Sequence, residues 1–231
     1  MRTITLAGPG KNALSTALMQ RMLGEVRAAK DEPLLLVGEG DAFSAGLNLK
    51  ELAELDVAGM TTFLGTLEAL VAALYEHPAP VVAWVNGHAI AGGCVMALTC
   101  DLRIMTARPG ARIGLNEVAL GLRFPPVTFL MTRRRVPAAS LERVLLEAAL
   151  YEAPAARHLG LVDEIGEEAD ARAMLDRLAS HPRDTYAEAK RAMRGSLEVS
   201  AEEQRRFREE TIPYWCSPEI KGRLRAVLAK K

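Results

Sequence analysis

The sequence has few of the features that mark secreted, membrane-bound or nucleic-acid-binding proteins. It contains only three cysteines in 231 residues, without CxxC spacing, so we expect the reduced thiols of a cytoplasmic protein rather than disulfides or a metal site. Lysine plus arginine (29) equal aspartate plus glutamate (29), which predicts neither nucleic acid nor an anionic membrane as a partner. The first apolar stretch ends at Gly8, too early for a signal peptide, and no later run is expected to be long enough to span a membrane.

Hydrophobic residues make up 49% of the chain, enough for a sizeable core. The first two-thirds alternates apolar strand-like and amphipathic helix-like segments, which predicts an α/β core with buried strands. Strands are expected at 3–6, 33–40, 79–87 and 101–107, and helices at 15–30, 48–55, 60–74 and 91–99. The later part is more charged and helical, so we divide the chain into a core, 1–180, and a C-terminal helical region, 181–231. Ser217 is expected to cap the last helix, whose modest apolar stripe should pack on the core or on another subunit.

Two glycine-containing turns each follow a predicted strand and precede a predicted helix. They are "FSAGLNL", 43–49, and "IAGGCVM", 90–96. Backbone N–H groups at such turns are unsatisfied, and two of them together can bind a developing oxygen anion. Glycines at a strand–helix junction also serve tight packing, and each motif taken alone favours that simpler interpretation.

The segment "RIGLNEVALGL" contains one acidic residue in apolar sequence. Glu117 is the only ionisable side chain from Ile113 to Leu122. A buried carboxylate there would have its pKa raised toward the range of a general base. An outward-facing glutamate at the edge of a strand is equally compatible with the pattern.

In their order and separation, "FSAGLNLKEL", "NGHAIAGGCVMALTCDLRIM" and "IGLNEVALGL" resemble the enoyl-CoA hydratase/isomerase superfamily, the crotonase fold. The resemblance implies a spiral of ββα units, a C-terminal helical region used in trimerisation, and a homotrimer or dimer of trimers. It also implies an acyl-CoA substrate, with coenzyme A as part of the substrate and no separate cofactor or metal. The thioester oxygen would be bound by the backbone N–H groups of Leu47 and Gly92, and Glu117 would be the catalytic acid/base.

The resemblance also narrows the reaction. Hydratases of the superfamily carry a second glutamate three residues after the glycine that corresponds to Gly92. Val95 stands at that position here. Hydration needs two carboxylates to orient water and to protonate carbon, whereas one carboxylate suffices to move a proton from C2 to C4. The chain is thus most similar to the mitochondrial-type Δ3,Δ2-enoyl-CoA isomerases. Hydration, decarboxylation, thioester hydrolysis and a non-catalytic acyl-CoA-binding role remain the alternatives.

The resemblance suggests further substrate contacts, which we expect from Ala13, Ala45, Lys50, Val95 and Phe124. Lys11, like Lys50, is a candidate contact for CoA phosphates. The segment "LRFPPV", 122–127, replaces a glycine-rich turn common in hydratases, which changes the pocket wall and leaves the acyl-chain preference open.

Other polar residues have a structural interpretation that is favoured over a functional one. His88 and Asp101 are expected to be hydrogen-bonded structural residues. The run Arg133 to Arg135 is expected to form a solvated helix face, with CoA phosphates or another subunit as the alternative partners. Tyr214 and Trp215 would anchor the C-terminal region to a neighbour, cap an acyl pocket or simply pack.

Overall fold

The computed structural model describes residues 1–229. Its strands are β1 (Arg2–Leu6), β2 (Leu34–Gly38), β3 (Ala42–Ser44), β4 (Val81–Val85), β5 (His88–Ile90), β6 (Leu102–Met105), β7 (Ile113–Gly114) and β8 (Glu164–Ile165). The helices of the first part are α1 (Pro9–Asn12), α2 (Thr16–Ala29), α3 (Leu49–Glu54), α4 (Val57–Tyr75), α5 (Gly92–Thr99) and α6 (Glu117–Leu120). They are followed by α7 (Pro126–Arg135), α8 (Ala138–Leu146), α9 (Ala153–His158) and α10 (Glu168–Ala179). The C-terminal part contains α11 (Arg183–Arg194), α12 (Ala201–Arg206), the π-helix η1 (Phe207–Thr211), α13 (Ile212–Trp215) and α14 (Pro218–Ala229).

The strands form two parallel sheets, and from β2 to β7 successive strands alternate between them. The larger sheet has the order β1-β2-β4-β6-β8 and the smaller one the order β3-β5-β7. In three successive units the first strand joins the large sheet and the second joins the small sheet, before the chain enters a helix. This repeat confirms the predicted α/β spiral of ββα units.

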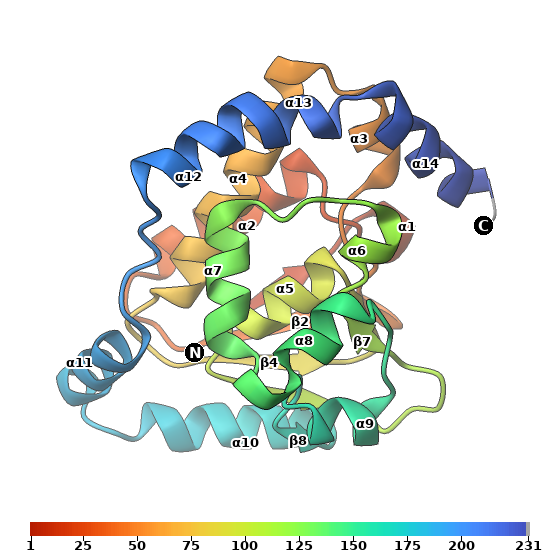
Figure 1. Cartoon of the computed structure of the whole chain (residues 1–231). Helices are drawn as coiled ribbons and strands as arrows, with labels where there is room; N and C mark the ends of the chain where they lie inside the picture. Colours follow the sequence, from red (N-terminus) through yellow and green to blue (C-terminus); the bar gives the residue numbers. More distant parts are fainter. Residues whose placement is uncertain (230–231) are drawn as a thin grey trace.

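Both faces of the large sheet are covered, which explains the continuous apolar runs in its strands. On β2, Leu34 and Leu36 face the main core with α2 and α4, whereas Leu35 belongs to a smaller cluster under α10. Figure 1 shows α10 along the bottom of the molecule and α4 behind α7, toward the top. All three leucines are fully buried.

Helix α4 corrects the expectation that no apolar run is long enough to span a membrane. It has 19 residues, and a window within it reaches a mean hydropathy of 1.6. Its residues Phe63, Leu67 and Leu74 are nevertheless part of the main core. Core helices of this length pass the same composition test, and 39% of this window is buried inside the protein.

The C-terminal helices pack on the core of their own chain. Helix α14 lies against α3, and α13 lies against α4, so that the blue segments of Figure 1 cross the top of the molecule. Ser217 caps α14 through its hydroxyl, which accepts the Ile220 N–H at 3.3 Å. Ile220 and Leu224 are buried against the core. Of the two expected partners for the last helix, the structure shows the core; the boundary at residue 180 and the trimer stay predictions.

Candidate functional site

The two predicted glycine turns lie side by side. The segment 11–14 pairs with the segment 45–48 through hydrogen bonds from Leu14 N–H to the Gly46 carbonyl (2.8 Å) and from Asn48 N–H to the Leu14 carbonyl (3.0 Å). A Cβ placed on Gly46 would lie 2.6 Å from the Ile90 carbonyl oxygen and 3.5 Å from the Gly92 nitrogen. The loop before α3 therefore touches the turn before α5, and the backbone of Leu47 is brought next to that of Gly92.

The glycines of this contact have different purposes. Gly46 adopts a φ of +90° directly against the second turn, so it needs both the conformation and the missing side chain. Gly93 lies on the backbone of β3, where a Cβ would overlap the Ser44 carbonyl. The sequence left open whether the pair Gly92-Gly93 serves close approach or packing. The structure shows packing at Gly93 and close approach to the Leu47 side chain at Gly92.

Two backbone N–H groups at this contact lack an acceptor. Within residues 1–229, neither Leu47 nor Gly92 donates a backbone hydrogen bond to the protein. Gly92 is the first residue of α5, where the helix dipole adds partial positive charge. The preceding Ala91 has a φ of +49°, a conformation that costs free energy for a residue with a side chain. Such strain beside two unsatisfied donors is typical of a preorganised anion-binding turn.

Glu117 lies close to the first turn of α5. Strand β5 pairs with β7, and the Ala91 N–H donates to the Gly114 carbonyl at 2.8 Å, three residues before Glu117. The negative charge of Glu117 contributes to raising the pKa of the Cys94 thiol, although burial is the larger cause. Of the two interpretations of this glutamate, the structure supports the buried one over the strand-edge one.

The environment of the Glu117 carboxyl disfavours its ionised form. The residue is 7% exposed, and its Oε2 has no hydrogen-bond partner among the described residues. Burial raises the pKa of Glu117 to about 7, and its own backbone N–H opposes this only in part. A carboxyl with this pKa exists in both protonation states near neutral pH, as a group that takes up and returns a proton must.

Val95 lies on the first turn of α5 and is 1% exposed, so the side of the turn that would carry a second carboxylate is apolar. Ala13 and Ala45 lie on the two paired segments beside Leu47, and Lys50 is exposed on the first turn of α3. The structure thus gathers these predicted substrate contacts around the two turns. Phe124 lies on the loop after α6 and packs against the main core. Its ring is 5.8 Å from that of Phe129, and it lines a groove of about 420 Å³ beside η1.

Asp101 and His88 make structural hydrogen bonds, whereas the role of Lys11 stays a prediction. Asp101 accepts the Val81 N–H at 2.6 Å, which confirms its structural role, and His88 accepts the Arg112 N–H at 3.3 Å. Lys11 lies 3.6 Å from Asp41 in an exposed ion pair. Its contact with CoA stays a prediction.

The run Arg133 to Arg135 is not the uniform solvated face expected from the sequence. Arg134 donates to the carbonyls of Arg194 and Ser196, and only Arg133 projects without a partner in the described residues. Arg135 donates to carbonyls at the C-terminal end of α5, those of Leu98, Cys100 and Asp101. Burial lowers the pKa of Arg135 to about 10. The helical periodicity of α7 points these neighbours in different directions: Arg135 points inward, whereas Arg134 stays exposed while it binds the two carbonyls.

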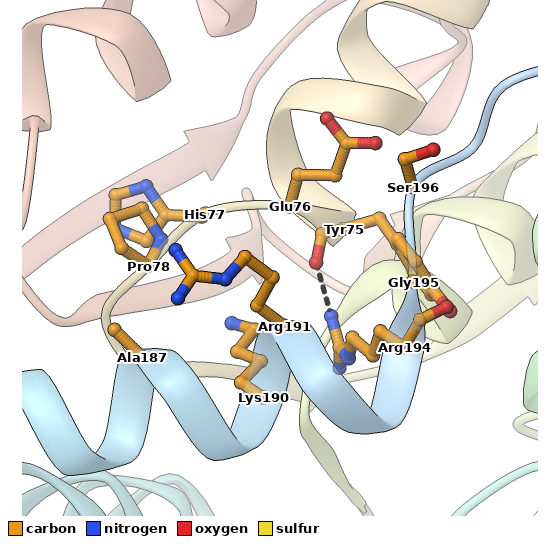
Figure 2. Close-up of a pocket in the computed structure, with 10 residues that line it drawn as sticks. All are labelled: Tyr75, Glu76, His77, Pro78, Ala187, Lys190, Arg191, Arg194, Gly195 and Ser196. Atoms are coloured by element: carbon orange, nitrogen blue, oxygen red, sulfur yellow. Dashed lines mark hydrogen bonds between the residues drawn. The ribbon is translucent and has the colours of Figure 1, made fainter.

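A buried cluster of charges fixes that same end of α5. Asp101 pairs with Lys190 at 2.9 Å and with Arg194 at 2.6 Å, both from α11. Figure 2 shows these two cations beside a cavity of about 270 Å³ between α11 and the C-terminal end of α4. An eight-residue helix is about 12 Å long at 1.5 Å per residue, so this cavity lies at the opposite end of α5 from the Gly92 N–H. The cluster therefore anchors the helix that begins at the Gly92 turn.

The sequence analysis missed one half-buried carboxyl. Glu68 on α4 accepts the Val127 N–H at 2.8 Å, at the first turn of α7. Burial raises the pKa of Glu68 to about 7, with the hydrogen bonds from Val127 and Thr128 acting in the opposite direction. A signal was present, because Glu68 is the only carboxylate among the residues of α4. We did not single out Glu68 because it lies within an apolar helix that is typical of a hydrophobic core.

Comparison with known proteins gives consistent matches over nearly the whole chain. The family model described as enoyl-CoA hydratase/isomerase matches residues 1–222. The chain is 32% identical over 206 residues to the 2,3-dehydroadipyl-CoA hydratase of Escherichia coli (strain K12), covering 85% of this chain and 79% of that protein. It is 29% identical over 165 residues to the mitochondrial enoyl-CoA delta isomerase 1 of Homo sapiens, covering 69% of this chain and 55% of that protein.

Solved structures agree on the fold. The human mitochondrial delta3-delta2-enoyl-CoA isomerase superposes with a TM-score of 0.88 at 24% identity, covering 99% of this chain and 92% of that one. An enoyl-CoA hydratase from Bacillus halodurans gives a TM-score of 0.82 at 26% identity, covering 97% and 95%. Isomerases and hydratases are thus both among the similar proteins, and similarity alone does not separate the two reactions.

Proposed function

Because this chain belongs to the enoyl-CoA hydratase/isomerase family, whose members act on acyl-CoA thioesters, we propose that it is an acyl-CoA isomerase that converts a 3-enoyl-CoA to the 2-enoyl-CoA. One observation carries the choice of reaction. A single buried carboxyl, that of Glu117, lies beside the first turn of α5, and the position that would supply a second one is Val95. One carboxyl can move a proton between two carbons but has no partner with which to hold and activate water.

The proposed mechanism uses the site in two proton transfers. The Glu117 carboxylate removes a proton from C2 of the substrate, and the electrons delocalise over the 3,4 double bond and the thioester carbonyl. The resulting dienolate carries its negative charge on the thioester oxygen, which the N–H groups of Leu47 and Gly92 bind. The protonated Glu117 then gives the proton to C4, so that the double bond lies between C2 and C3 and the carboxylate is restored.

The burial of Glu117 matches this cycle. A carboxylate with an ordinary pKa near 4.5 would be a weak base and would rarely be protonated at neutral pH. At a pKa of about 7 it is a stronger base and a competent acid in turn. The apolar surroundings that raise the pKa also exclude the water that would compete for the dienolate.

A panel of acyl-CoA substrates tests the proposal. The protein is incubated separately with a 3-hexenoyl-CoA and with crotonyl-CoA, and formation of the conjugated thioester is compared with formation of the 3-hydroxyacyl product. We expect isomerisation to exceed hydration at equal substrate concentration. With substrate deuterated at C2, part of the label should appear at C4 of the product, because one carboxyl carries the same proton between the two carbons. Faster hydration would reject the assignment.

Hydration is the second candidate because the hydratase of Escherichia coli is 32% identical to this chain. It requires a group other than Val95 to hold water near the substrate. The same panel includes this outcome, and turnover of crotonyl-CoA that exceeds isomerisation would establish it.

The dependence of the rate on pH gives a separate prediction. Since Glu117 must be ionised to remove the C2 proton, and its pKa is about 7, kcat/KM should fall as the pH drops below 7. The slope should approach about tenfold per pH unit once the carboxyl is mainly protonated. Initial rates between pH 5 and pH 9 at low substrate concentration measure this limb. A limb at the ordinary pKa of glutamate would show that the carboxyl is solvated and would contradict its assigned environment.

A further inference from the structure

The C-terminal helix α13 is hydrogen-bonded to the loop that follows Glu117. The Tyr214 hydroxyl donates to the Gly121 carbonyl at 2.8 Å, and the Trp215 indole N–H donates to the Arg123 carbonyl at 3.0 Å. The Arg123 guanidinium lies over the Tyr214 ring, 4.0 Å from its centroid. Trp215 is 1% exposed. Two buried or half-buried aromatic side chains thus direct their polar atoms to the same short stretch of backbone.

The same stretch of backbone is also bound at its far end, by Glu68 on α4. We call residues 122–127 the wall segment. Its first N–H, that of Leu122, donates to the Glu117 carbonyl at 2.9 Å, and its last, that of Val127, donates to the Glu68 carboxylate at 2.8 Å. Pro125 and Pro126 restrict the backbone in between. The segment is therefore fixed at the α6 end and at the α7 end, and α13 holds it in the middle.

The arrangement matters because Glu117 has little to hold it in place. Helix α6 is only four residues long and ends at Gly121, which has a φ of +71°. A helix of one turn is not stable on its own and takes its position from its contacts. The Oε2 atom of Glu117 makes no hydrogen bond among the described residues, so the direction of the carboxyl follows from the backbone of α6. The carbonyl bound by Tyr214 belongs to the residue that terminates this helix.

We infer that Tyr214 and Trp215 are positioning residues for Glu117, and that Glu68 anchors the other end of the wall segment. The inference rests on the proposed function only in naming Glu117 as the reacting carboxyl. Tyr214 and Trp215 hold α6, and with it the Glu117 carboxyl, beside the first turn of α5, and they close the loop over it against water. Loss of the Tyr214 hydrogen bond lets α6 move and lets water reach the carboxyl. The chemical step is then impaired, while the turns that bind the thioester are unchanged.

The test compares two tyrosine variants with the same chemical change. Tyr214→Phe removes the hydroxyl that binds Gly121. Tyr75→Phe removes a hydroxyl that donates to the Arg194 carbonyl at 3.1 Å, at the other end of α5, and serves as the matched control. We expect Tyr214→Phe to lower kcat by about 5- to 20-fold with KM changed less than about twofold, as for an interaction needed in the transition state rather than in binding. Tyr75→Phe should leave both constants within about twofold.

A second readout does not depend on turnover. In protein labelled with ¹³C at the glutamate carboxyls, the Glu117 signal is identified by its loss in Glu117→Gln, and its titration is followed by NMR. The Glu117 carboxyl should titrate at lower pH in Tyr214→Phe than in the wild type, because admitted water relieves the desolvation that raises its pKa. Tyr75→Phe should leave the titration unchanged.

The role of Glu68 is tested by two substitutions, one that keeps a hydrogen-bond acceptor and one that removes it. Glu68→Gln keeps a carbonyl oxygen that can accept the Val127 N–H, so it should retain most of the wild-type kcat, whereas Glu68→Leu should lower it. Equal effects of Tyr214→Phe and Tyr75→Phe on kcat, or an unchanged Glu117 titration in Tyr214→Phe, would overturn the inference. A wild-type protein that fails to isomerise 3-enoyl-CoA would reject the proposed function alone, because the titration would still report on the position of Glu117.

Discussion

Glu117→Gln is expected to lower kcat for 3-enoyl-CoA isomerisation by about 10³- to 10⁴-fold, at the upper end of the range for a single acid/base group. In the proposed mechanism one carboxyl carries out both proton transfers, and glutamine can neither accept the C2 proton nor return one to C4. The two N–H groups and the apolar walls remain, so KM should change little. Steady-state kinetics with a 3-enoyl-CoA measures the effect.

The same substitution predicts a change in stability that shows whether the variant is folded and the carboxyl buried. The pKa of Glu117 is raised from 4.5 to about 7, so the folded protein binds the proton more tightly than the unfolded chain. For a raised acid pKa, stability is fully present below 4.5 and is lost as the pH rises through 7. The wild type should therefore lose about 2 to 3 kcal/mol relative to Glu117→Gln between pH 5 and pH 8. Urea titrations at both pH values measure the difference, and parallel changes in the two proteins would contradict the buried environment.

Gly46→Ala should lower kcat/KM by about 10²- to 10³-fold, as the loss of one oxyanion donor does in other enzymes. A Cβ at this position would lie 2.6 Å from the Ile90 carbonyl oxygen, which is backbone and cannot move away easily. The loop before α3 must then retreat from the turn before α5, which separates the Leu47 and Gly92 N–H groups. Developing charge on the thioester oxygen loses one of its two donors.

Gly40→Ala is the matched control for this prediction. Gly40 has a φ of +70°, comparable with the +90° of Gly46, but a Cβ there would have no atom within 4 Å. Alanine at Gly40 thus introduces the same kind of backbone strain, about 1 kcal/mol, without closing the contact between the turns. Its kcat/KM should remain near that of the wild type. Equal losses in both variants would show that strain, and not the position of the Leu47 N–H, causes the effect.

Much of the architecture follows from local patterns in the sequence. Alternating apolar strands and amphipathic helices predict an α/β core, because strands covered on both faces must be apolar throughout, as Leu34 to Leu36 are; the spiral was implied by the family resemblance. Asn48 caps α3 as expected, since a side-chain cap acts over three residues. The two glycine turns and Glu117 were identified from motif order, and the structure brings the two turns into contact, with Glu117 near the first turn of α5.

The tertiary structure alone decided the features that depend on contacts between distant segments. Whether Glu117 is buried could not be read from its mostly apolar neighbours, because burial depends on β7 pairing with β5 and on the elements that cover it. The apolar length of α4 is typical of a membrane span until its contacts with the core are known. The same helix conceals Glu68, whose partner is 59 residues away. Arg135 reads as part of a solvated run, yet its partners are the carbonyls at the end of α5.

The division has a physical reason. Strand and helix formation, capping and turn conformation depend on neighbours within a few residues, and the sequence displays these directly. Desolvation, and with it the pKa of a buried carboxyl, depends on every atom that replaces water around the group. For this protein the sequence by itself determined the α/β core, the two turns and the carboxylate that we propose as the acid/base group. Only the folded chain decided that Gly92 and Leu47 lie together, that Glu117 is shielded from water, and that α13 lies on the loop beside it.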